Sequence, residues 1–407
     1  MDKRKTILIV GGGFGGVRCA LDLAKLRLVG NPRVVLLSDK PHFEHIPSLY
    51  KVATGCSPLE VCIPLREIFA RRKIEVCTET VDGAHLSEKI LIGKSGMHYA
   101  YDFLVLAVGS ETTFFSIPGL DKNAFALKTL TDALRLNWHL TELFEQVRKS
   151  QKTVQIVPAA QIVVIGGGYS GVELAGEIAA YARKYIERHG GDSSLITVNL
   201  IQASPRILET VPKRVRDRIV RRLNRLHVNI NVNRPIGKDD IESDDFFRGA
   251  IAPKTLIWTA GISPNALYKR IEGLSFDKDG RVLVDRFLQA RGHRNVFVIG
   301  DGASTRWSGM AQTALHDGRY VARAILDRLY LRRSSEYRPR KPVSVIPVGY
   351  GWAAAVFSWM TLYGFFGWCV REAADLHFFL SILSPLRALR VWRSGLQKVE
   401  SNKINNM

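Results

Sequence analysis

The chain has 407 residues, of which 46% are hydrophobic and 24% are charged. This composition excludes an intrinsically disordered chain, and the length predicts two or three domains. The formal net charge of +20 indicates attraction to something anionic, which leaves nucleic acid, an acidic membrane face and phosphorylated ligands as candidate partners.

The chain contains five cysteines, Cys19, Cys56, Cys62, Cys77 and Cys369, and their spacing fits neither a disulfide framework nor a zinc site. Their odd number favours reduced thiols in a cytosolic compartment. The basic N-terminus leads into an apolar run that glycines interrupt too early for a secretory signal. We therefore expect a protein that is not exported and that has no metal site.

The first third of the chain follows a β-α-β order, which predicts a parallel sheet. We expect a buried strand at 6–10, a helix at 17–28, a strand at 34–37 and a further strand at 101–110.

The next part repeats this order after a long helix. We expect a helix at 130–148, a strand-turn-helix unit at 162–180 and strands at 196–203, 255–262 and 295–304. A helix at 311–331 and a basic, proline-containing connector at 331–342 follow, and beyond them the composition becomes aromatic and apolar.

Both strand-turn-helix units carry the Gly-x-Gly-x-x-Gly pattern of a dinucleotide-binding turn. The first glycine makes the turn, the second lets the backbone approach a pyrophosphate, and the third lets the helix pack on the strand. These positions are Gly11, Gly13 and Gly16 in the first unit and Gly166, Gly168 and Gly171 in the second. One such run is weak evidence of a binding site, but two in the right context are much stronger.

Two acidic residues extend the first site. Asp39 follows the second strand, where a carboxylate grips the adenosine ribose, although it also suits a turn in "SDKP". Asp301 ends the strand in "VFVIGDGAS", where a carboxylate can bind flavin ribityl hydroxyls. A first dinucleotide fold that is interrupted by a second and then completed is the layout of flavoproteins with FAD and a nicotinamide.

The chain resembles the type II (alternative) NADH:quinone oxidoreductases. The resemblance rests on "PHFEHIPSLYKVATG", "YDFLVLAVGS", "ALKTLTDA", "GGGYSGVELAGEIA", "PRIL", "WTAGI", "VFVIGDGA" and "MAQTALHDG". It implies an α/β fold with two Rossmann-like domains, in which the NAD(P)H-binding domain interrupts the FAD-binding domain, plus a C-terminal membrane-associating segment. It also implies FAD, NADH as donor and a membrane quinone as acceptor.

On this basis we expect four parts of the chain. They are the first part of the FAD-binding domain (1–125), the NAD(P)H-binding domain (126–265), the second part of the FAD-binding domain (266–335) and a membrane-attachment region (336–407).

The resemblance implies three catalytic residues. Glu173 matches the family glutamate beside the flavin and the nicotinamide, although an acid also suits the first turn of a helix. Gln312 matches the glutamine at the quinone end of the flavin, although it also suits a helix cap. His316 departs from a second family glutamine, and it is either a proton donor or a surface residue.

The expected cofactor contacts lie in and beside the turns. Besides the six glycines of the two patterns they are Phe14, Gly15, Asp39, Lys40, Gly109, Gln202, Arg206, Gly261 and Asp301.

The donor preference depends on the second unit. Family members selective for NADH have an acid where this chain has Gln202, and an amide does not repel the 2′-phosphate of NADPH. Arg206 lies four residues later and could bind that phosphate. We therefore expect NADPH to serve as a second donor.

Two other classes of flavoprotein stay open. A disulfide reductase needs a redox cysteine pair, but five residues, including Pro58, separate Cys56 from Cys62, and sulfide oxidation needs more cysteines late in the chain than Cys369. A flavoprotein similar to the apoptosis-inducing factors would use the positive charge to bind nucleic acid. Residues 206–225 carry a net +6 and residues 332–407 a net +7, but we find no nucleic-acid motif and expect no such partner.

The tail is expected to attach the protein to a membrane. Residues 352–370 are long enough to span a bilayer, but internal glycines and scattered tryptophans count against it. In residues 371–395 an apolar stripe is followed by arginines alternating with Leu386, Leu389 and Trp392, as in a helix that lies on anionic lipid. The alternatives are a hairpin packed on its own core or a homodimer contact. We expect a peripheral protein on the cytoplasmic side of the cell membrane.

Overall fold

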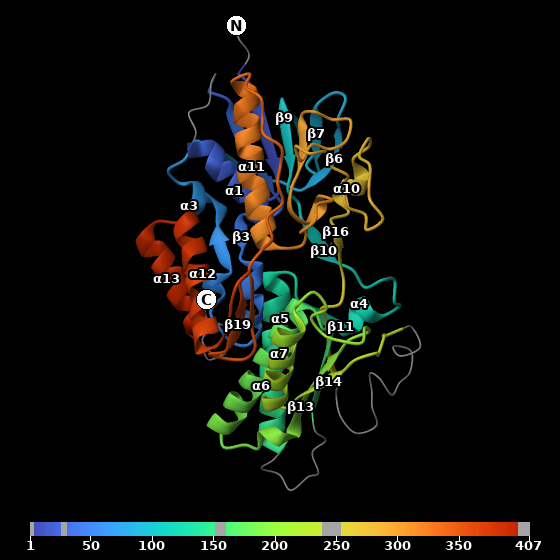
Figure 1. Cartoon of the computed structure of the whole chain (residues 1–407), viewed down its shortest axis with the longest axis vertical. Coiled ribbons are helices and arrows are strands. Elements are labelled where there is room, and N and C mark those ends of the chain that lie inside the picture. Colours follow the sequence, from blue (N-terminus) through green and yellow to red (C-terminus); the bar gives the residue numbers. More distant parts are fainter. Residues whose placement is uncertain (1–3, 26–30, 151–159, 238–253, 398–407) are drawn as a thin grey trace. The chain divides into compact units, whose positions relative to one another are not determined.

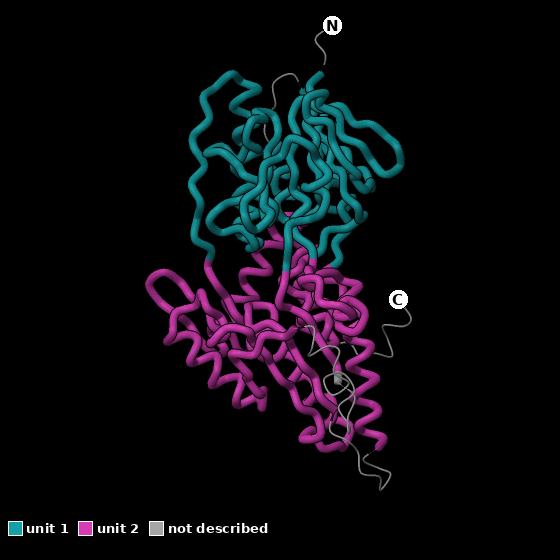
Figure 2. The backbone as a smooth tube through the Cα atoms, turned by 90° about the vertical axis from the view of Figure 1, so that its right-hand side faces the viewer, with its two compact units in different colours: residues 1–44, 62–111, 262–342 teal, residues 45–61, 112–261, 343–407 magenta. Residues whose placement is uncertain are grey.

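The structure is a computed structural model that describes residues 4–25, 31–150, 160–237 and 254–397 (Figure 1). The chain forms two compact units, each built from several chain segments (Figure 2). Unit 1 comprises the described parts of residues 1–44, 62–111 and 262–342, and unit 2 those of residues 45–61, 112–261 and 343–407. The tail, expected as a region of its own from 336 onward, groups with unit 2 from residue 343.

Unit 1 contains a parallel five-stranded sheet. Its order is β17-β9-β1-β2-β5, with bounds β1 (Thr6–Val10), β2 (Arg33–Ser38), β5 (Glu75–Thr78), β9 (Phe103–Leu106) and β17 (Val296–Val298). Ile9 aligns with Leu36 on one side and Val105 on the other. Successive residues Ile7, Leu8 and Ile9 are all buried, as expected for a parallel strand covered on both faces.

Two long helices pack against each other in unit 1, α1 (Phe14–Lys25) and α11 (Ala311–Leu329). A Cβ on Gly318 would lie 2.5 Å from the Gly15 carbonyl oxygen, so the close approach requires glycine. The smaller elements are β3 (His42–Glu44), β4 (Cys62–Pro64), α3 (Leu65–Phe69), β6 (Val81–His85), β7 (Ile90–Gly93), β8 (His98–Ala100), β16 (Ile262–Pro264) and α10 (Leu267–Arg270).

Unit 2 contains a second parallel five-stranded sheet. Its order is β11-β15-β12-β13-β14, with bounds β11 (Ala124–Ala126), β12 (Ala160–Ile165), β13 (Ile196–Ile201), β14 (Val228–Asn231) and β15 (Lys254–Trp258). The helices of this unit's first segments are α2 (Leu49–Ala53), α4 (Leu120–Asn123), α5 (Leu130–Ser150), α6 (Tyr169–Arg188) and α7 (Lys213–Arg225). The short strand β10 (Ser110–Thr112) lies where the chain passes from unit 1 to unit 2, before α4. Ile162 and Val164 join the core formed with α5, α6 and α7, whereas Val163 and Ile165 join a smaller core. The alternation places apolar cores on both faces of the sheet.

The strands and helices expected from the sequence are present within the described residues, and the end of the helix expected at 17–28 lies outside them. The glycine turns follow β1 and β12 directly, and α7 buries Val215, Ile219 and Leu223 as its spacing predicts. The α/β class with two parallel sheets, the basis of the expected fold, is confirmed.

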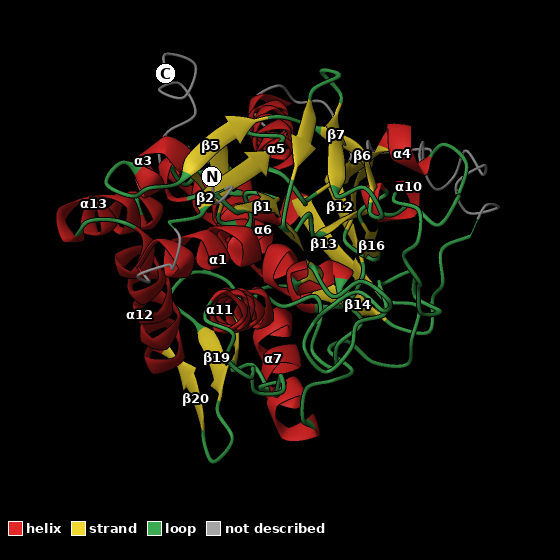
Figure 3. Ribbon diagram, turned by 90° about the horizontal axis from the view of Figure 1, so that it is seen from above, coloured by secondary structure: helices red, strands yellow, loops and turns green. Residues whose placement is uncertain are grey.

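The tail of unit 2 contains strands where the sequence allowed a spanning helix. It forms an antiparallel sheet of β18 (Ser344–Pro347), β19 (Ala353–Val356) and β20 (Thr361–Gly364), followed by α12 (Phe365–Ile382) and α13 (Pro385–Leu396). Figure 3 shows β19 and β20 as a hairpin beside α12. In the described part of the chain, no helix combines the length and the apolar character needed to cross a bilayer.

The expected apolar stripe on the first tail helix is wrong in part. Phe379 is buried, but Leu380 is 44% exposed, and the buried face of α12 also carries Arg371, Glu372 and Asp375. The sequence prediction considered only the apolar residues of this helix, whereas its charged residues meet buried partners of opposite charge.

Candidate functional site: two dinucleotide turns

The first glycines of the two turns adopt the same backbone conformation. Gly11 has φ +113° and Gly166 has φ +114°. A Cβ would lie 2.3 Å from the Ala107 carbonyl oxygen at Gly11 and 2.8 Å from the Ala260 backbone at Gly166. Both positions therefore require glycine for conformation and for space.

The third glycines let each helix start against its turn. A Cβ on Gly16 would lie 2.0 Å from the Gly11 carbonyl oxygen, and one on Gly171 would lie 1.8 Å from that of Gly166. The roles that the sequence assigned to these positions match this geometry.

The second glycines face open space. An ideal Cβ on Gly13 or on Gly168 meets no atom within 4 Å. Gly168 is the N-cap of α6 and provides no side-chain acceptor for the first N–H groups of the helix. Each turn thus presents an open backbone cradle that a methyl group would fill, and this fits the pyrophosphate of a dinucleotide.

The glycines between the first two have a packing role that sequence reasoning missed. A Cβ on Gly12 would lie 2.5 Å from Ser38 Oγ, and one on Gly167 would lie 2.7 Å from a methyl carbon of Ile207. The contact at Gly12 comes from the last residue of β2, and the contact at Gly167 comes from the segment after β13. The run of three glycines in each unit was the available signal.

The candidate FAD contacts of unit 1 lie around its turn. Phe14 packs edge-on against Phe43, with 4.9 Å between ring centroids, and Gly15 approaches Ile299. Asp39 is exposed directly after β2, and Lys40 forms a 2.8 Å ion pair with Glu44. Asp39 therefore lies where an acid can reach a ribose, while the Lys40 ammonium is held by an acid that the sequence did not single out.

A second group in unit 1 follows β9 and β17. Gly109 has φ +71° and open space at its Cβ position. Ser110 donates a hydrogen bond to the carboxylate of Asp301, so the structure brings these two strand ends together. Asp301 is held in a defined orientation, as a carboxylate that binds ligand hydroxyls must be.

Gln312 and His316 lie on the first turns of α11. Gln312 is exposed, and the N-cap residue Met310 makes no side-chain cap for the helix. His316 Nε2 lies 3.0 Å from the Arg338 carbonyl oxygen, and its ring lies 5.4 Å from that of Tyr337. The connector at 331–342 therefore covers His316, which leaves Gln312 as the more open side chain.

Asp317, next to His316, is a buried acid that the sequence analysis did not consider. It accepts hydrogen bonds from the Gly300 N–H at 3.0 Å and from the Tyr337 hydroxyl. Burial raises the pKa of Asp317 to about 6. Asp317 thus links α11 to the strand end that carries Asp301.

Glu173 lies on the second turn of α6, with a partly buried side chain. Burial by the surrounding protein raises its pKa to about 8, with Asp375 adding to the shift and Arg371 opposing it. Glu173 therefore keeps its proton at neutral pH. A neutral acid can donate a hydrogen bond that a carboxylate cannot.

Arg371 and Asp375 belong to a buried ionic cluster, which we define as Lys51, Glu60, Arg371, Glu372 and Asp375. Lys51 Nζ lies 3.1 Å from Glu60, 3.1 Å from Glu372 and 3.6 Å from Asp375, and Arg371 donates to Asp375 at 3.0 Å. The cluster joins α12 to α2 and the turn Pro58–Glu60. It could not be found from the sequence because Lys51 and Glu60 lie more than 300 positions before the other three members.

The cluster sets unusual protonation states. Burial raises the pKa of Glu60 to about 7 although Lys51 opposes the shift. Burial alone would lower the pKa of Lys51, but the three carboxyl groups raise it well above its ordinary value. His45 bonds Ser48, and burial lowers the pKa of His45 to about 3, so its ring is neutral.

Gln202 and Arg206 follow β13 in unit 2. Gln202 Oε1 accepts from the Gly167 N–H at 2.7 Å, so its side chain lies on the turn. Gly261, predicted at the end of a neighbouring strand, would place a Cβ 2.6 Å from the Thr113 carbonyl oxygen.

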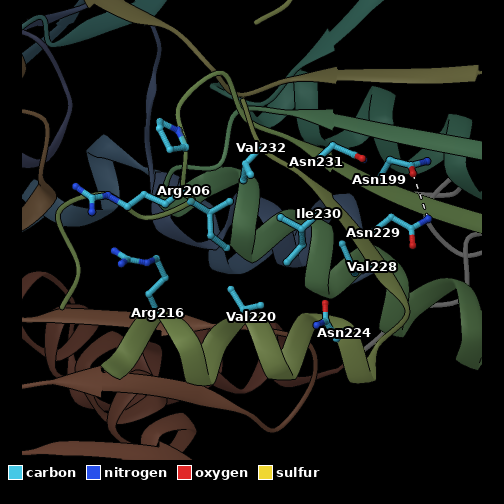
Figure 4. A pocket seen from close by; sticks show the side chains of 12 residues that line it. Asn199, Arg206, Arg216, Val220, Asn224, Val228, Asn229, Ile230, Asn231 and Val232 are labelled. Atoms are coloured by element: carbon cyan, nitrogen blue, oxygen red, sulfur yellow. Dashed lines mark hydrogen bonds between the residues drawn. The ribbon is translucent and has the colours of Figure 1, made fainter. Parts of the chain in front are cut away.

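Arg206 lines an open hollow of about 680 Å³ between α7 and the ends of β13 and β14. Figure 4 shows Arg206 and Arg216 extending toward the same end of this hollow. The other lining residues are Asn199, Pro205, Ile207, Val220, Asn224, Val228, Asn229, Ile230, Asn231 and Val232. Two cations at one end of a polar hollow suit a phosphate group.

All five cysteines lie in described parts of the chain, and none of them forms a disulfide. Cys56 is buried in unit 2, whereas Cys62 lies in unit 1, where burial raises its thiol pKa. A raised pKa disfavours the reactive thiolate. Among the described residues, no group of acidic, histidine and cysteine side chains is arranged to hold a metal ion.

Comparisons with known proteins agree with the resemblance seen in the sequence. The chain is 28% identical to the type II NADH:quinone oxidoreductase Ndh of Mycobacterium tuberculosis over 96% of this chain and 88% of that protein. It is 24% identical to a type II NADH:quinone oxidoreductase of Staphylococcus haemolyticus over 82% of this chain and 85% of that protein. The fold matches the structure of NDH2 from Plasmodium falciparum in complex with NADH, with a TM-score of 0.80 at 16% identity over 98% of this chain and 100% of that one.

The resemblance to type II NADH:quinone oxidoreductases is thus confirmed, and the comparisons support FAD and NADH as cofactors. The family model of the pyridine nucleotide-disulphide oxidoreductases matches residues 5–318, which include both glycine turns. The chain therefore belongs to the pyridine nucleotide-disulphide oxidoreductase family.

Proposed function

We propose that this chain passes a hydride from NADH to FAD and then two electrons to a membrane quinone, without pumping protons. The observation that carries the proposal is the pair of open glycine turns, one in each unit, with matching geometry. Two such turns in one chain fit two dinucleotides. The similarity to quinone oxidoreductases along most of the chain supports quinone as the acceptor.

FAD supplies the redox chemistry, and the residues of unit 1 hold it. The turn Gly11–Gly16 receives the pyrophosphate, Asp39 the adenosine ribose and Asp301 the ribityl hydroxyls. The uncapped N-terminus of α11 would present its positive end to a flavin bound beside it, which would favour negative charge there.

Gln312 is assigned to the quinone side because it is the exposed side chain at the start of α11. His316 holds the connector through Nε2, which leaves Nδ1 as the nitrogen through which it exchanges a proton. In unit 2, Glu173 is assigned to the nicotinamide, as a neutral acid that orients the donor.

NADH is the preferred donor, and NADPH is a weaker second donor. Gln202 brings no negative charge to the strand end, and Arg206 lies close enough in sequence to meet a 2′-phosphate. Both features permit NADPH without favouring it over NADH.

The tail is assigned to the cytoplasmic surface of the membrane. Trp359 is 82% exposed, Phe366 70% and Leu386 81%, and the exposed Arg390 and Arg393 lie on the same helix as Leu386. Exposed aromatic and leucine side chains beside arginines suit an anionic lipid surface.

The direct test of the redox function is spectroscopic. The purified full-length protein should be yellow, NADH should bleach the flavin absorbance, and a short-chain quinone should restore it. A colourless protein, or a flavin that NADH does not reduce, contradicts the proposal.

Two variants assign the half-reactions. In stopped-flow measurements, Glu173→Ala should slow reduction by NADH at least about tenfold, since positioning contacts contribute on this scale, and Gln312→Ala should mainly slow reoxidation by quinone. Parent rates in both variants would remove these residues from the mechanism.

Membrane attachment is tested with point variants, because deleting α12 would strip Lys51 of two carboxylates. The double variant Leu386→Ser, Leu389→Ser should release the protein from vesicles of anionic phospholipid while FAD stays bound. Leu331→Ser is the matched control, because Leu331 is 95% exposed outside the tail. Equal binding of the double variant and the parent contradicts attachment through α13.

A further inference from the structure

The segment after β13, residues 202–209, folds back over the glycine turn of unit 2. The Leu208 N–H donates to the Gly167 carbonyl oxygen at 2.8 Å, and Leu208 is buried with φ +49°. Ile207 packs against Gly167 in the same place. This left-handed turn brings the next residue, Glu209, back to the end of β13.

Both the oxygen and the nitrogen of the Gln202 side-chain amide make hydrogen bonds within the protein. Its Oε1 accepts from the Gly167 N–H at 2.7 Å, and its Nε2 donates to Ser204 Oγ at 2.8 Å. The same Nε2 lies 3.5 Å from Oε1 of Glu209. The Gln202 side chain is therefore held against the turn and its own segment by both ends of its amide, while the Glu209 carboxylate lies one contact away.

We propose that Glu209 provides the acidic group that recognises the adenosine ribose of NADH and disfavours the 2′-phosphate of NADPH. The proposal rests on the proposed use of this turn as the nicotinamide donor site. Glu209 is the only acid in the segment 202–209, and it is exposed to an incoming ligand.

The chemistry follows from where a dinucleotide lies in such a fold. Its pyrophosphate meets the helix N-terminus, and its adenosine ribose meets the end of the second strand. A carboxylate accepts hydrogen bonds from ribose hydroxyls but repels a phosphate of charge about −2. Arg206 opposes this repulsion from the side of the hollow, so NADPH is weakened as a donor but not rejected.

The binding test uses two nucleotide fragments and the FAD-loaded full chain. Calorimetry compares adenosine 5′-diphosphate with adenosine 2′,5′-diphosphate, which mimic the adenosine ends of NADH and NADPH. Glu209→Gln should tighten binding of the 2′,5′-diphosphate about tenfold, and it should weaken binding of the 5′-diphosphate by about threefold or less, the scale of hydrogen bonds to a charged group at an exposed site.

The control removes the same charge elsewhere in unit 2. Glu187 is exposed at the far end of α6, where it pairs with Arg183. Glu187→Gln should leave the ratio of the two affinities at the parent value. If Glu209→Gln changes the ratio no more than Glu187→Gln does, the proposal is wrong.

A charge swap makes the assignment specific. The double variant Gln202→Glu, Glu209→Gln moves the acid to the strand end and should restore the parent preference for the 5′-diphosphate. A preference that stays lost would show that Glu209 acts through the fold of the segment rather than its charge, and would overturn the proposal.

The redox assay gives an independent readout. With the parent enzyme active on NADH, Glu209→Gln should raise the NADPH to NADH ratio of kcat/KM by about ten- to thirtyfold, in line with the affinities. If NADH does not reduce the flavin of the parent enzyme, only the proposed function is contradicted, because the fragment affinities still decide the role of Glu209. If the parent enzyme binds both nucleotide fragments with equal affinity, the role of Glu209 is overturned, while the proposed redox function is unaffected.

Discussion

The glycine turns of units 1 and 2 share a backbone conformation, but the helices that follow them carry a base and an acid at the same position. Two residues after the third glycine stands Arg18 in α1 and Glu173 in α6. Arg18 is buried and pairs with Asp22 on its own helix at 2.6 Å. On α6 the residue four positions after Glu173 is Glu177, and the cation that acts on Glu173 is Arg371 of the tail.

This difference shows that the backbone of a glycine turn is determined by nearby residues, whereas its electrostatic surroundings can depend on distant ones. The turn is set within a few residues by glycines that nothing else can replace. The electrostatics of the second turn depend on α12, which the chain adds about two hundred residues later. Substitutions in the turns and in their charged surroundings should therefore have different effects.

The third glycines should give the largest effects. In Gly16→Ala or Gly171→Ala the new methyl would lie within 2.0 Å of a backbone oxygen, so the turn must move. Gly16→Ala should yield protein with at least about tenfold less FAD, and Gly171→Ala should yield yellow protein whose KM for NADH rises at least about tenfold, because backbone shifts of this size remove several hydrogen bonds. Flavin absorbance and steady-state kinetics measure both.

Variants of the second glycines are the matched control, because they separate an effect on ligand binding from an effect on the fold. Gly13→Ala and Gly168→Ala add a methyl to open space, so the melting temperature without nucleotide should stay near the parent value. Binding should still fall, because the methyl occupies the path of the pyrophosphate. Equal ligand binding by parent and variant would show that the dinucleotide does not approach these residues.

The buried ionic cluster should give the largest effect on stability. Lys51→Met leaves Glu60, Glu372 and Asp375 together without their shared cation. Removing one partner of a buried ion pair costs about 3–5 kcal/mol, whereas an exposed pair contributes about 0–1 kcal/mol. The exposed pair Arg33 and Glu75 provides the control through Arg33→Met.

Chemical denaturation of the FAD-loaded protein compares the two variants. A loss for Lys51→Met no greater than that for Arg33→Met would mean that the cluster does not hold the tail to α2.

Glu60 should make stability depend on pH. Its folded pKa of about 7 lies above the ordinary value of 4.5, chiefly because of burial. The folded state then binds more protons than the unfolded state between these values, so the contribution of Glu60 to stability is complete below about pH 4.5 and is lost as the pH rises through 7. Glu60→Gln removes this titration, so its stability relative to the parent should rise from pH 5 to pH 8. A difference that is constant over this range contradicts the shift.

The sequence predicted the turns well because their requirements lie within a short stretch. The positive φ at Gly11 and Gly166, the close packing at Gly16 and Gly171 and the burial of β1 and β12 all leave a pattern that can be read residue by residue. The strand ends at Asp39 and Asp301 followed from the same pattern.

The surroundings of the second turn could not be predicted in this way. Residues 352–370 are apolar enough to suggest a helix, but β19 and β20 form there before α12 begins at Phe365. Arg371, Glu372 and Asp375 appear as surface charges in the sequence, because their partners lie near residue 50. Glu209 was missed because its approach to Gln202 depends on the left-handed turn at Leu208.

The protonation of Glu173 should give the smallest effect and the sharpest test of the tail's influence on the second turn. Burial holds its pKa near 8, with Asp375 adding to the shift and Arg371 opposing it, so Glu173 is neutral at pH 7 and ionised at pH 9. A negative charge beside the nicotinamide stabilises the cation that forms as NADH gives up its hydride. For a partly exposed site this amounts to about 0.5–1 kcal/mol, so reduction of the flavin should speed up about two- to fivefold between pH 7 and pH 9. Glu173→Gln keeps the shape of the side chain but stays neutral, so stopped-flow rates of this variant should lack the rise, while Glu187→Gln should keep it. A rise that survives in Glu173→Gln would assign the titration to another group and would leave Glu173 with a positioning role only.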